Sequence, residues 1–171
     1  MKKSVFIVML LASMLCFHSC AAYQLETLQG KYSSGMSVET DKPVDEVWEK
    51  VIDYFAMSAA PISLIDKESG LIVSERVICP ATIERNGKPF SAGAFVVIPD
   101  YYSASGSMAK PRYWSLVATA NFNVRIKVTN RKTLIYVNLY GMRVYDSQTN
   151  RDWGYGASTG VFEEDLLGLF K

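Results

Sequence analysis

The chain has 171 residues, of which 49% are hydrophobic and 20% are charged, with 18 basic and 17 acidic side chains. This length suits one domain, and a formal net charge of +1 offers no clustered basic face of the kind that binds nucleic acid. The composition therefore argues against a nucleic-acid partner.

Residues 1–19 are predicted to be a signal peptide. Lys2 and Lys3 precede a nearly unbroken apolar run from Val5 to Phe17. A basic start followed by about a dozen apolar residues is typical of an export leader, and the run is shorter than the ~20 residues that cross a bilayer as a helix. No later segment reaches that length without charges, so we expect an exported protein without a transmembrane helix.

Cys20 follows the leader in a pattern that partly matches the lipobox of lipoprotein signal peptidase. Phe17 and His18 depart from the usual lipobox residues, as in the looser lipoboxes of Bacteroides-type lipoproteins, which this leader resembles. Cleavage before Cys20 would leave a diacylated cysteine, and each buried methylene of its lipid contributes ~0.8 kcal/mol to membrane attachment. The alternative is that ordinary signal peptidase cuts among Ser19–Ala22 and releases a soluble protein.

The cysteine and histidine residues limit the kinds of catalytic and metal site that the chain could contain. Cys16 lies in the leader and lipid would occupy Cys20, so Cys79 is expected to be a buried thiol. Without acylation, Cys20 and Cys79 could instead form a disulfide. The single histidine, His18, leaves with the leader, which argues against His-dependent nucleophilic catalysis and His-ligated zinc. We expect no cofactor and no metal site.

After cleavage, residues 20–33 are predicted to be a tether and residues 34–171 one domain. Met36–Glu39 is predicted to be a strand. From Pro43, which suits the first helical position, apolar residues recur at the spacing of one helical face: Val44, Val47, Trp48, Val51, Ile52 and Phe55. We expect this helix to end near Ser58–Ala60 and its stripe, Trp48 included, to lie in the core.

Several strands follow. Strands at 62–65 and 71–76 flank a turn that ends at Gly70, and Asn86-Gly87 predicts a second hairpin between short strands. Residues 94–98 suit a further strand, and residues 100–114 have the composition of a loop.

The last part of the chain has the clearest period. Residues 116–128 alternate between apolar and polar side chains, and residues 133–144 return after a turn, as expected for a half-buried antiparallel sheet. Residues 160–170 predict a short amphipathic helix. The predicted fold class is α+β, an antiparallel sheet with one long helix packed across it and a short C-terminal helix.

Three patterns that could suggest catalysis have structural explanations. The GASTG segment at 156–160 matches a nucleophile motif but is predicted to be a turn before the last helix, with no histidine partner. Ser107 and Lys110 match SxxK inside the long loop. The 17 acidic residues permit a carboxylate pair such as glycosidases use, but those on the helices are expected on solvated faces: Asp45, Glu46, Glu49, Asp53, Glu163, Glu164 and Asp165.

Aromatic residues near the predicted loops are the candidate binding residues. They could form a platform for a partner protein or a glycan, or they could cap the open ends of a small core. They are Tyr101, Tyr102, Tyr113, Trp114, Trp153 and Tyr155.

The segments PVDEVWEKVIDYF, ISLIDKESGLIVSE, NVRIKVTNRKTLIYVNL and STGVFEEDLL together resemble Bacteroides-type lipoproteins without an assigned activity. The helix followed by IDKESGLIVSE also resembles the helix-grip domains of BamC-type lipoproteins, accessory parts of outer-membrane protein assembly. This resemblance implies a helix across a curved antiparallel sheet whose groove or edge serves for interaction, and it supplies no catalytic residues.

We therefore expect a non-catalytic binding or scaffolding module of the cell envelope, attached to a membrane through Cys20, with an envelope protein or glycan as partner. The alternatives are a carboxylate-dependent hydrolase of envelope glycans and a carrier of an apolar ligand. Surface-exported lipoproteins of this type resemble one another in an acidic run after the cysteine. Residues 21–26 lack such a run, which favours the periplasmic face of the outer membrane.

Overall fold

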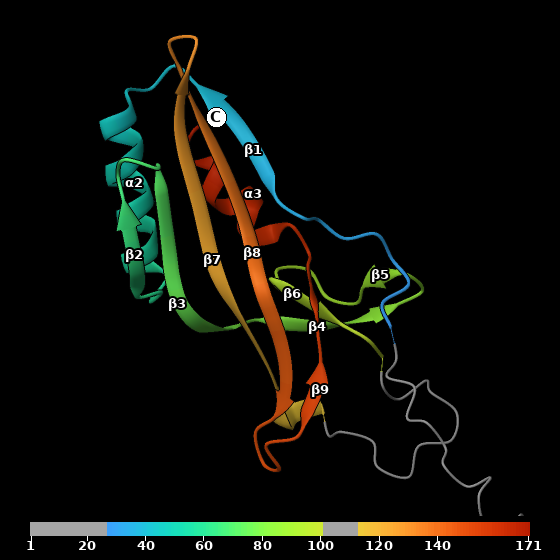
Figure 1. Cartoon of the computed structure of the whole chain (residues 1–171). Helices are drawn as coiled ribbons and strands as arrows, with labels where there is room; N and C mark the ends of the chain where they lie inside the picture. Colours follow the sequence, from blue (N-terminus) through green and yellow to red (C-terminus); the bar gives the residue numbers. More distant parts are fainter. Residues whose placement is uncertain (1–26, 101–112) are drawn as a thin grey trace, which may run out of the picture.

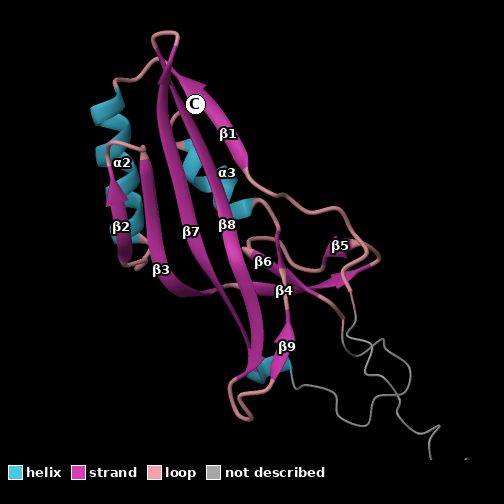
Figure 2. Ribbon diagram, in the orientation of Figure 1, coloured by secondary structure: helices cyan, strands magenta, loops and turns pink. Residues whose placement is uncertain are grey.

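The computed structural model describes residues 27–100 and 113–171. The predicted signal peptide, Cys20, Tyr101, Tyr102 and the SxxK segment lie outside these ranges. The described chain is a mixed domain of α-helices and mainly antiparallel strands, with strands predominating (Figure 1). Figure 2 shows helices packed beside the long strands.

The strands are β1 (Met36–Thr40), β2 (Ile62–Asp66), β3 (Leu71–Cys79), β4 (Ala81–Arg85), β5 (Lys88–Pro89), β6 (Val96–Ile98), β7 (Leu116–Thr129), β8 (Lys132–Asp146), β9 (Asp152–Gly154) and β10 (Ala157–Ser158). The helices are α2 (Val44–Met57), α3 (Val161–Gly168) and the short 3-10 helix η1 (Tyr113–Ser115).

The main sheet has the order β1-β8-β7-β3-β2, with β9 paired to β8, and all its pairs are antiparallel. A second sheet has the order β10-β6-β4-β5. The prediction of a single antiparallel sheet was wrong in this respect, because β4 and β6 pair in parallel. The hairpin partner β5 occupies one edge of β4, so the returning chain places β6 on the other edge.

The two longest strands confirm the alternation seen in the sequence. Val124 and Val137 face each other and are fully buried, while Arg125 and Tyr136, one residue along each strand, are exposed. Asn130 has a positive φ, as the two-residue turn between these strands requires. One face of the sheet therefore carries the core and the other faces outward.

Helix α2 forms as its apolar stripe predicts, and Val47, Val51 and Phe55 are fully buried. The expected long helix is not found. The 14 residues of α2 span about 21 Å, whereas the 15 residues of β8 span about 50 Å. The sheet is longer than α2, and α3 covers more of the same face.

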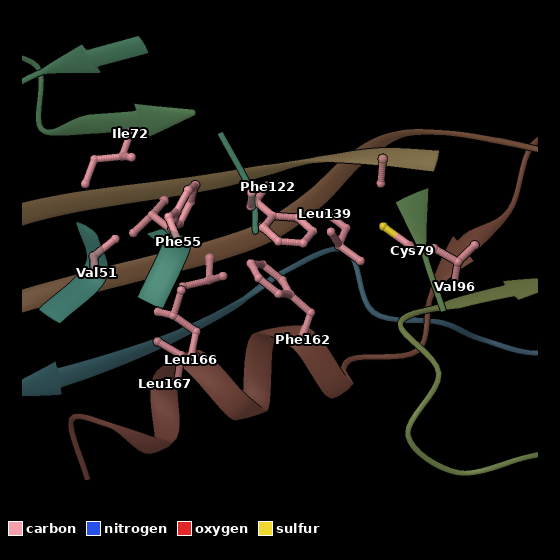
Figure 3. Packing of buried hydrophobic residues seen from close by; sticks show 14 of the residues in the cluster. Val51, Phe55, Ile72, Cys79, Val96, Phe122, Leu139, Phe162, Leu166 and Leu167 are labelled. Atoms are coloured by element: carbon pink, nitrogen blue, oxygen red, sulfur yellow. The ribbon is translucent and has the colours of Figure 1, made fainter. Parts of the chain in front are cut away.

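Phenylalanine rings lie among aliphatic side chains in the space between the helices and the sheet (Figure 3). Phe122 of β7 lies 4.0 Å from Phe162 of α3 and 5.9 Å from Phe55 of α2, measured between ring centroids. Phe95 contacts both Phe122 and Phe162. These rings join both helices to one core.

Glu163 corrects the prediction that the acidic residues of the last helix are solvated, because it is fully buried. Its carboxylate accepts hydrogen bonds from the Ser158 hydroxyl at 2.8 and 2.9 Å and from the Leu139 N–H at 3.3 Å. β1 begins opposite Val137, so it supplies no acceptor for the Leu139 N–H. Glu163 takes that place at the sheet edge.

Ser158 corrects a second prediction, that of a turn at 156–160. Ala157 and Ser158 form the short strand β10 against β6, and the Ser158 side chain is 1% exposed. Only Gly160, with a φ of 93°, turns the chain into α3. The GASTG serine is therefore a buried hydrogen-bonding group.

The end of the predicted tether, 20–33, contacts the domain within the described residues. Residues 29, 30 and 32 donate hydrogen bonds to Glu84 of β4, and Ser33 forms a bridge with Ser158. The chain is therefore attached to the domain from about residue 29 onward.

Candidate functional site

Two of the predicted binding aromatics lie on the surface. Trp114 in η1 is 76% exposed, and Tyr155, just after β9, is 68% exposed. Tyr113 begins η1. Ser115 ties η1 to the end of β8 by accepting hydrogen bonds from Ser147. The exposed aromatics therefore lie at the end of the main sheet where β7 begins and β8 ends.

The other predicted aromatics lie elsewhere. Trp153 of β9 is 9% exposed and belongs to the core, and the Arg151 guanidinium lies 4.4 Å over its ring. Trp153 thus fits the core-capping alternative rather than the platform. Tyr101 and Tyr102 lie outside the described residues.

Beside Tyr155, the outward face of the main sheet holds an open cleft of about 530 Å³. It crosses β3, β7, β8 and β9, and Ile78 at its border is 73% exposed. The lining residues are Arg76, Ile78, Thr119, Arg143, Val144, Tyr145, Asn150 and Asp152. Two guanidinium groups and a tyrosine thus line one shallow depression.

Arg76 is held across three strands. Its Nη1 donates to the carbonyl oxygen of Gly141 at 2.7 Å and to Thr119 Oγ1 at 3.1 Å. None of the four ion pairs found among the described residues includes Arg76. Its charge is therefore positioned by neutral acceptors, and no carboxylate of the described chain neutralises it directly.

Arg143 is held by β9 and the residues after it. Its guanidinium forms an ion pair with Asp152, and its Nη1 donates to the Tyr155 hydroxyl at 3.1 Å. The same guanidinium lies 4.8 Å from the centre of the Tyr155 ring. These contacts fix Tyr155 at the border of the cleft, where an exposed ring and a cation are adjacent.

Irregular strand pairing creates this site. β3 carries an extra residue between Val73 and Arg76 where it pairs with β7, and β8 carries one between Tyr140 and Arg143, opposite Thr119–Asn121 of β7. Such bulges redirect side chains and increase local twist. Gly141 in β8 has a φ of 63°, and a Cβ there would lie 3.2 Å from Arg76 Nη2. The bulge thus requires a residue that tolerates left-handed backbone.

Arg76, Arg143 and Asp152 were not predicted as site residues, because cross-strand neighbours depend on a register that strand periodicity does not reveal. Gly141 is the signal that could have indicated the site, since a glycine inside a strand often marks a bulge.

A second, more apolar surface lies at the end of α2. Met57 is 88% exposed and Leu169 is 41% exposed, and both line an open cleft of about 540 Å³. Tyr54 also lines it, and burial, followed by the charge of Asp165, raises the pKa of its hydroxyl. This surface carries none of the predicted site residues.

Comparison of the chain with protein-family models and with curated proteins finds no match to either. Within the described ranges, neither α-helix has the length and apolarity needed to cross a membrane. The same ranges contain no cluster of three or more His, Cys, Asp or Glu side chains arranged to hold a metal ion.

Proposed function

We propose that this chain is a lipoprotein of the bacterial cell envelope whose domain is a non-catalytic binding or scaffolding module. The observation that carries the proposal is the arginine-lined cleft on the outward sheet face, bordered by the exposed Tyr155. Its partner is an envelope protein or glycan that presents carboxylate or phosphate groups.

The composition of the cleft supports recognition of anionic groups. Arginine and tyrosine are enriched at protein interfaces, and a guanidinium matches the planar geometry of carboxylates and phosphates. Arg76 and Arg143 are both held by neighbouring groups before a partner arrives. Such preorganisation lowers the entropy cost of binding.

Attachment through Cys20 is the second part of the proposal. It is supported by the basic and apolar leader and the partial lipobox of the sequence. The lack of an acidic run after Cys20 favours the periplasmic face of the outer membrane. We also propose that the domain is related to the helix-grip domains of BamC-type lipoproteins, with α2 as the helix that packs across the sheet.

Packing favours a binding module over the two alternatives. An apolar carrier needs open space between helices and sheet, where the rings of Phe55, Phe122 and Phe162 are in contact. A hydrolase that used the cleft would need two carboxylates converging on substrate, whereas Asp152 is the one carboxylate among the described residues that line it, and it is paired with Arg143.

Crosslinking in intact envelopes, followed by purification of the tagged chain, tests the proposal. We expect a defined partner with the native chain and at least tenfold less of it with Arg76→Ala/Arg143→Ala. Arg125→Ala is the matched control, because Arg125 is exposed on the same sheet face but lies six residues along β7 from Thr119, about 20 Å away. Cys20→Ala should move the chain to the soluble fraction.

Equal partner recovery with the double variant and with Arg125→Ala would contradict the cleft as binding site. A Cys20→Ala chain that stays in the membrane fraction would contradict the lipid anchor. Release of product from a defined envelope glycan by the purified chain would favour the hydrolase alternative.

A further inference from the structure

The N-terminal end of the described chain is bound to the turn between β4 and β5. The Glu84 carboxylate, 6% exposed, accepts hydrogen bonds from the N–H groups of Gln29 at 2.8 Å and Gly30 at 2.6 Å. It also accepts one from the Tyr32 hydroxyl at 2.6 Å. Burial, followed by the bond to Glu84, raises the pKa of Tyr32, so this hydroxyl remains protonated as a donor.

The contact leaves no room for Gly30 to be replaced by a larger residue. A Cβ on Gly30 would lie 2.3 Å from the carbonyl oxygen of Gly87 in the β4–β5 turn. The chain at residues 29–32 is therefore packed closely against this turn. The segment that leads back to residue 20 leaves the domain at this place.

The distance from this point to the proposed lipid is short. Nine residue steps separate Cys20 from Gln29, and a fully extended chain covers at most about 32 Å in that length. Insertion of the acyl chains of Cys20 would therefore keep residue 29, and the β4–β5 turn beside it, within about that distance of the bilayer.

The exposed side chains at this turn suit a membrane surface. Arg85, Lys88 and Lys31 are exposed, and none of the ion pairs of the described residues includes them. Phe90 is 61% exposed, with the Arg85 guanidinium 4.2 Å over its ring. Aromatic rings and long basic side chains are favoured at the headgroup level, and basic residues are attracted to anionic lipids.

We propose that Lys31, Arg85, Lys88 and Phe90 form a membrane-facing surface that contacts anionic phospholipid headgroups. The proposal rests on the lipid anchor at Cys20 put forward above. It adds an orientation, because the β4–β5 turn faces the bilayer while the turn between β7 and β8 lies at the far end of the sheet (Figure 1).

Quenching by labelled lipid tests this orientation. A cysteine introduced at Ala92, exposed beside Phe90, or at Thr129, exposed at the β7–β8 turn, carries a fluorophore. Cys79 is 4% exposed and an acylated Cys20 has no free thiol, so labelling is confined to the new cysteine. The acylated full-length protein is placed in phosphatidylglycerol-containing vesicles with nitroxide-headgroup lipid, and vesicle flotation is measured in parallel.

We expect quenching at position 92 to be at least threefold stronger than at 129. Adding Arg85→Ser, Lys88→Ser and Phe90→Ser should reduce it to the level at 129, as should vesicles of phosphatidylcholine alone. Floating protein with equal quenching at both positions, or unchanged quenching in the triple variant, overturns this proposal alone. Protein that does not float overturns the lipid anchor and this proposal together.

Discussion

Glu163 is the position at which a single substitution should reveal most about this fold. Replacing it by leucine removes the acceptor for two buried donors, the Ser158 hydroxyl and the Leu139 N–H. Each unsatisfied buried donor costs about 1–3 kcal/mol. We therefore expect Glu163→Leu to lower the free energy of unfolding by about 3 kcal/mol, or Tm by roughly 10 °C in a domain of this size.

Urea unfolding followed by tryptophan fluorescence provides the measurement, on the chain from residue 20 with Cys20→Ser. Glu164→Leu is the matched control, because Glu164 is exposed in the same first turn of α3, and its loss should stay below about 1 kcal/mol.

A double-mutant cycle with Ser158→Ala isolates the pair. If the hydroxyl and the carboxylate stabilise each other as the 2.8 Å contact indicates, their coupling energy should be about 1–3 kcal/mol. Equal losses for Glu163→Leu and Glu164→Leu, or a coupling energy near zero, would refute the assignment of Glu163 as an acceptor built into the sheet edge.

Three further outcomes are expected. Phe162→Ala should cost about 3–5 kcal/mol in urea unfolding, because the ring is fully buried between Phe122 and Phe95, and Leu169→Ala, at 41% exposure, should cost far less. Burial disfavours the charged form of Glu84, but hydrogen bonds from Tyr32, Gln29 and Gly30 outweigh it and lower its pKa. The wild-type advantage over Glu84→Gln should therefore be fully present above the unfolded-state pKa and be lost as the pH falls through the folded-state pKa, which urea unfolding from pH 7 to pH 3 measures. Burial raises the pKa of the Cys79 thiol to about 11, so its reaction with a thiol reagent at pH 8 should be at least a hundredfold slower in the native protein than in urea.

Much of the fold follows from periodicity alone. The stripe that starts at Val44 predicts α2, and the alternation over 116–128 predicts β7, because one face of each element must be buried. Asn86, with a φ of 51°, occupies the tight turn that Asn-Gly predicts. Each of these predictions depends only on residues that are near one another in the sequence.

The features that the sequence did not predict depend on contacts between distant segments. Strands β9 and β10 have 3 and 2 residues, too few for a period to be visible. Glu163 stands in an acidic run that has the composition of a solvated face. Its burial is made favourable by two donors on other elements, the Ser158 hydroxyl and the Leu139 N–H that lies beyond the start of β1. The cleft arises where a bulge in β3 meets a bulge in β8 at Gly141, so no contiguous motif encodes it.

The chain runs directly from the cleft to the proposed membrane-facing surface, through β3 and then β4. Only Pro80 separates the two strands, and Arg76 lines the cleft while Arg85 ends at the turn. Nine residue steps of extended chain cover at most about 30 Å. On the proposed membrane orientation, with the β4–β5 turn on the bilayer, the cleft would therefore stand no more than about 30 Å above the lipid. If both proposals hold, a membrane-attached partner could reach the cleft only with anionic groups placed within that height.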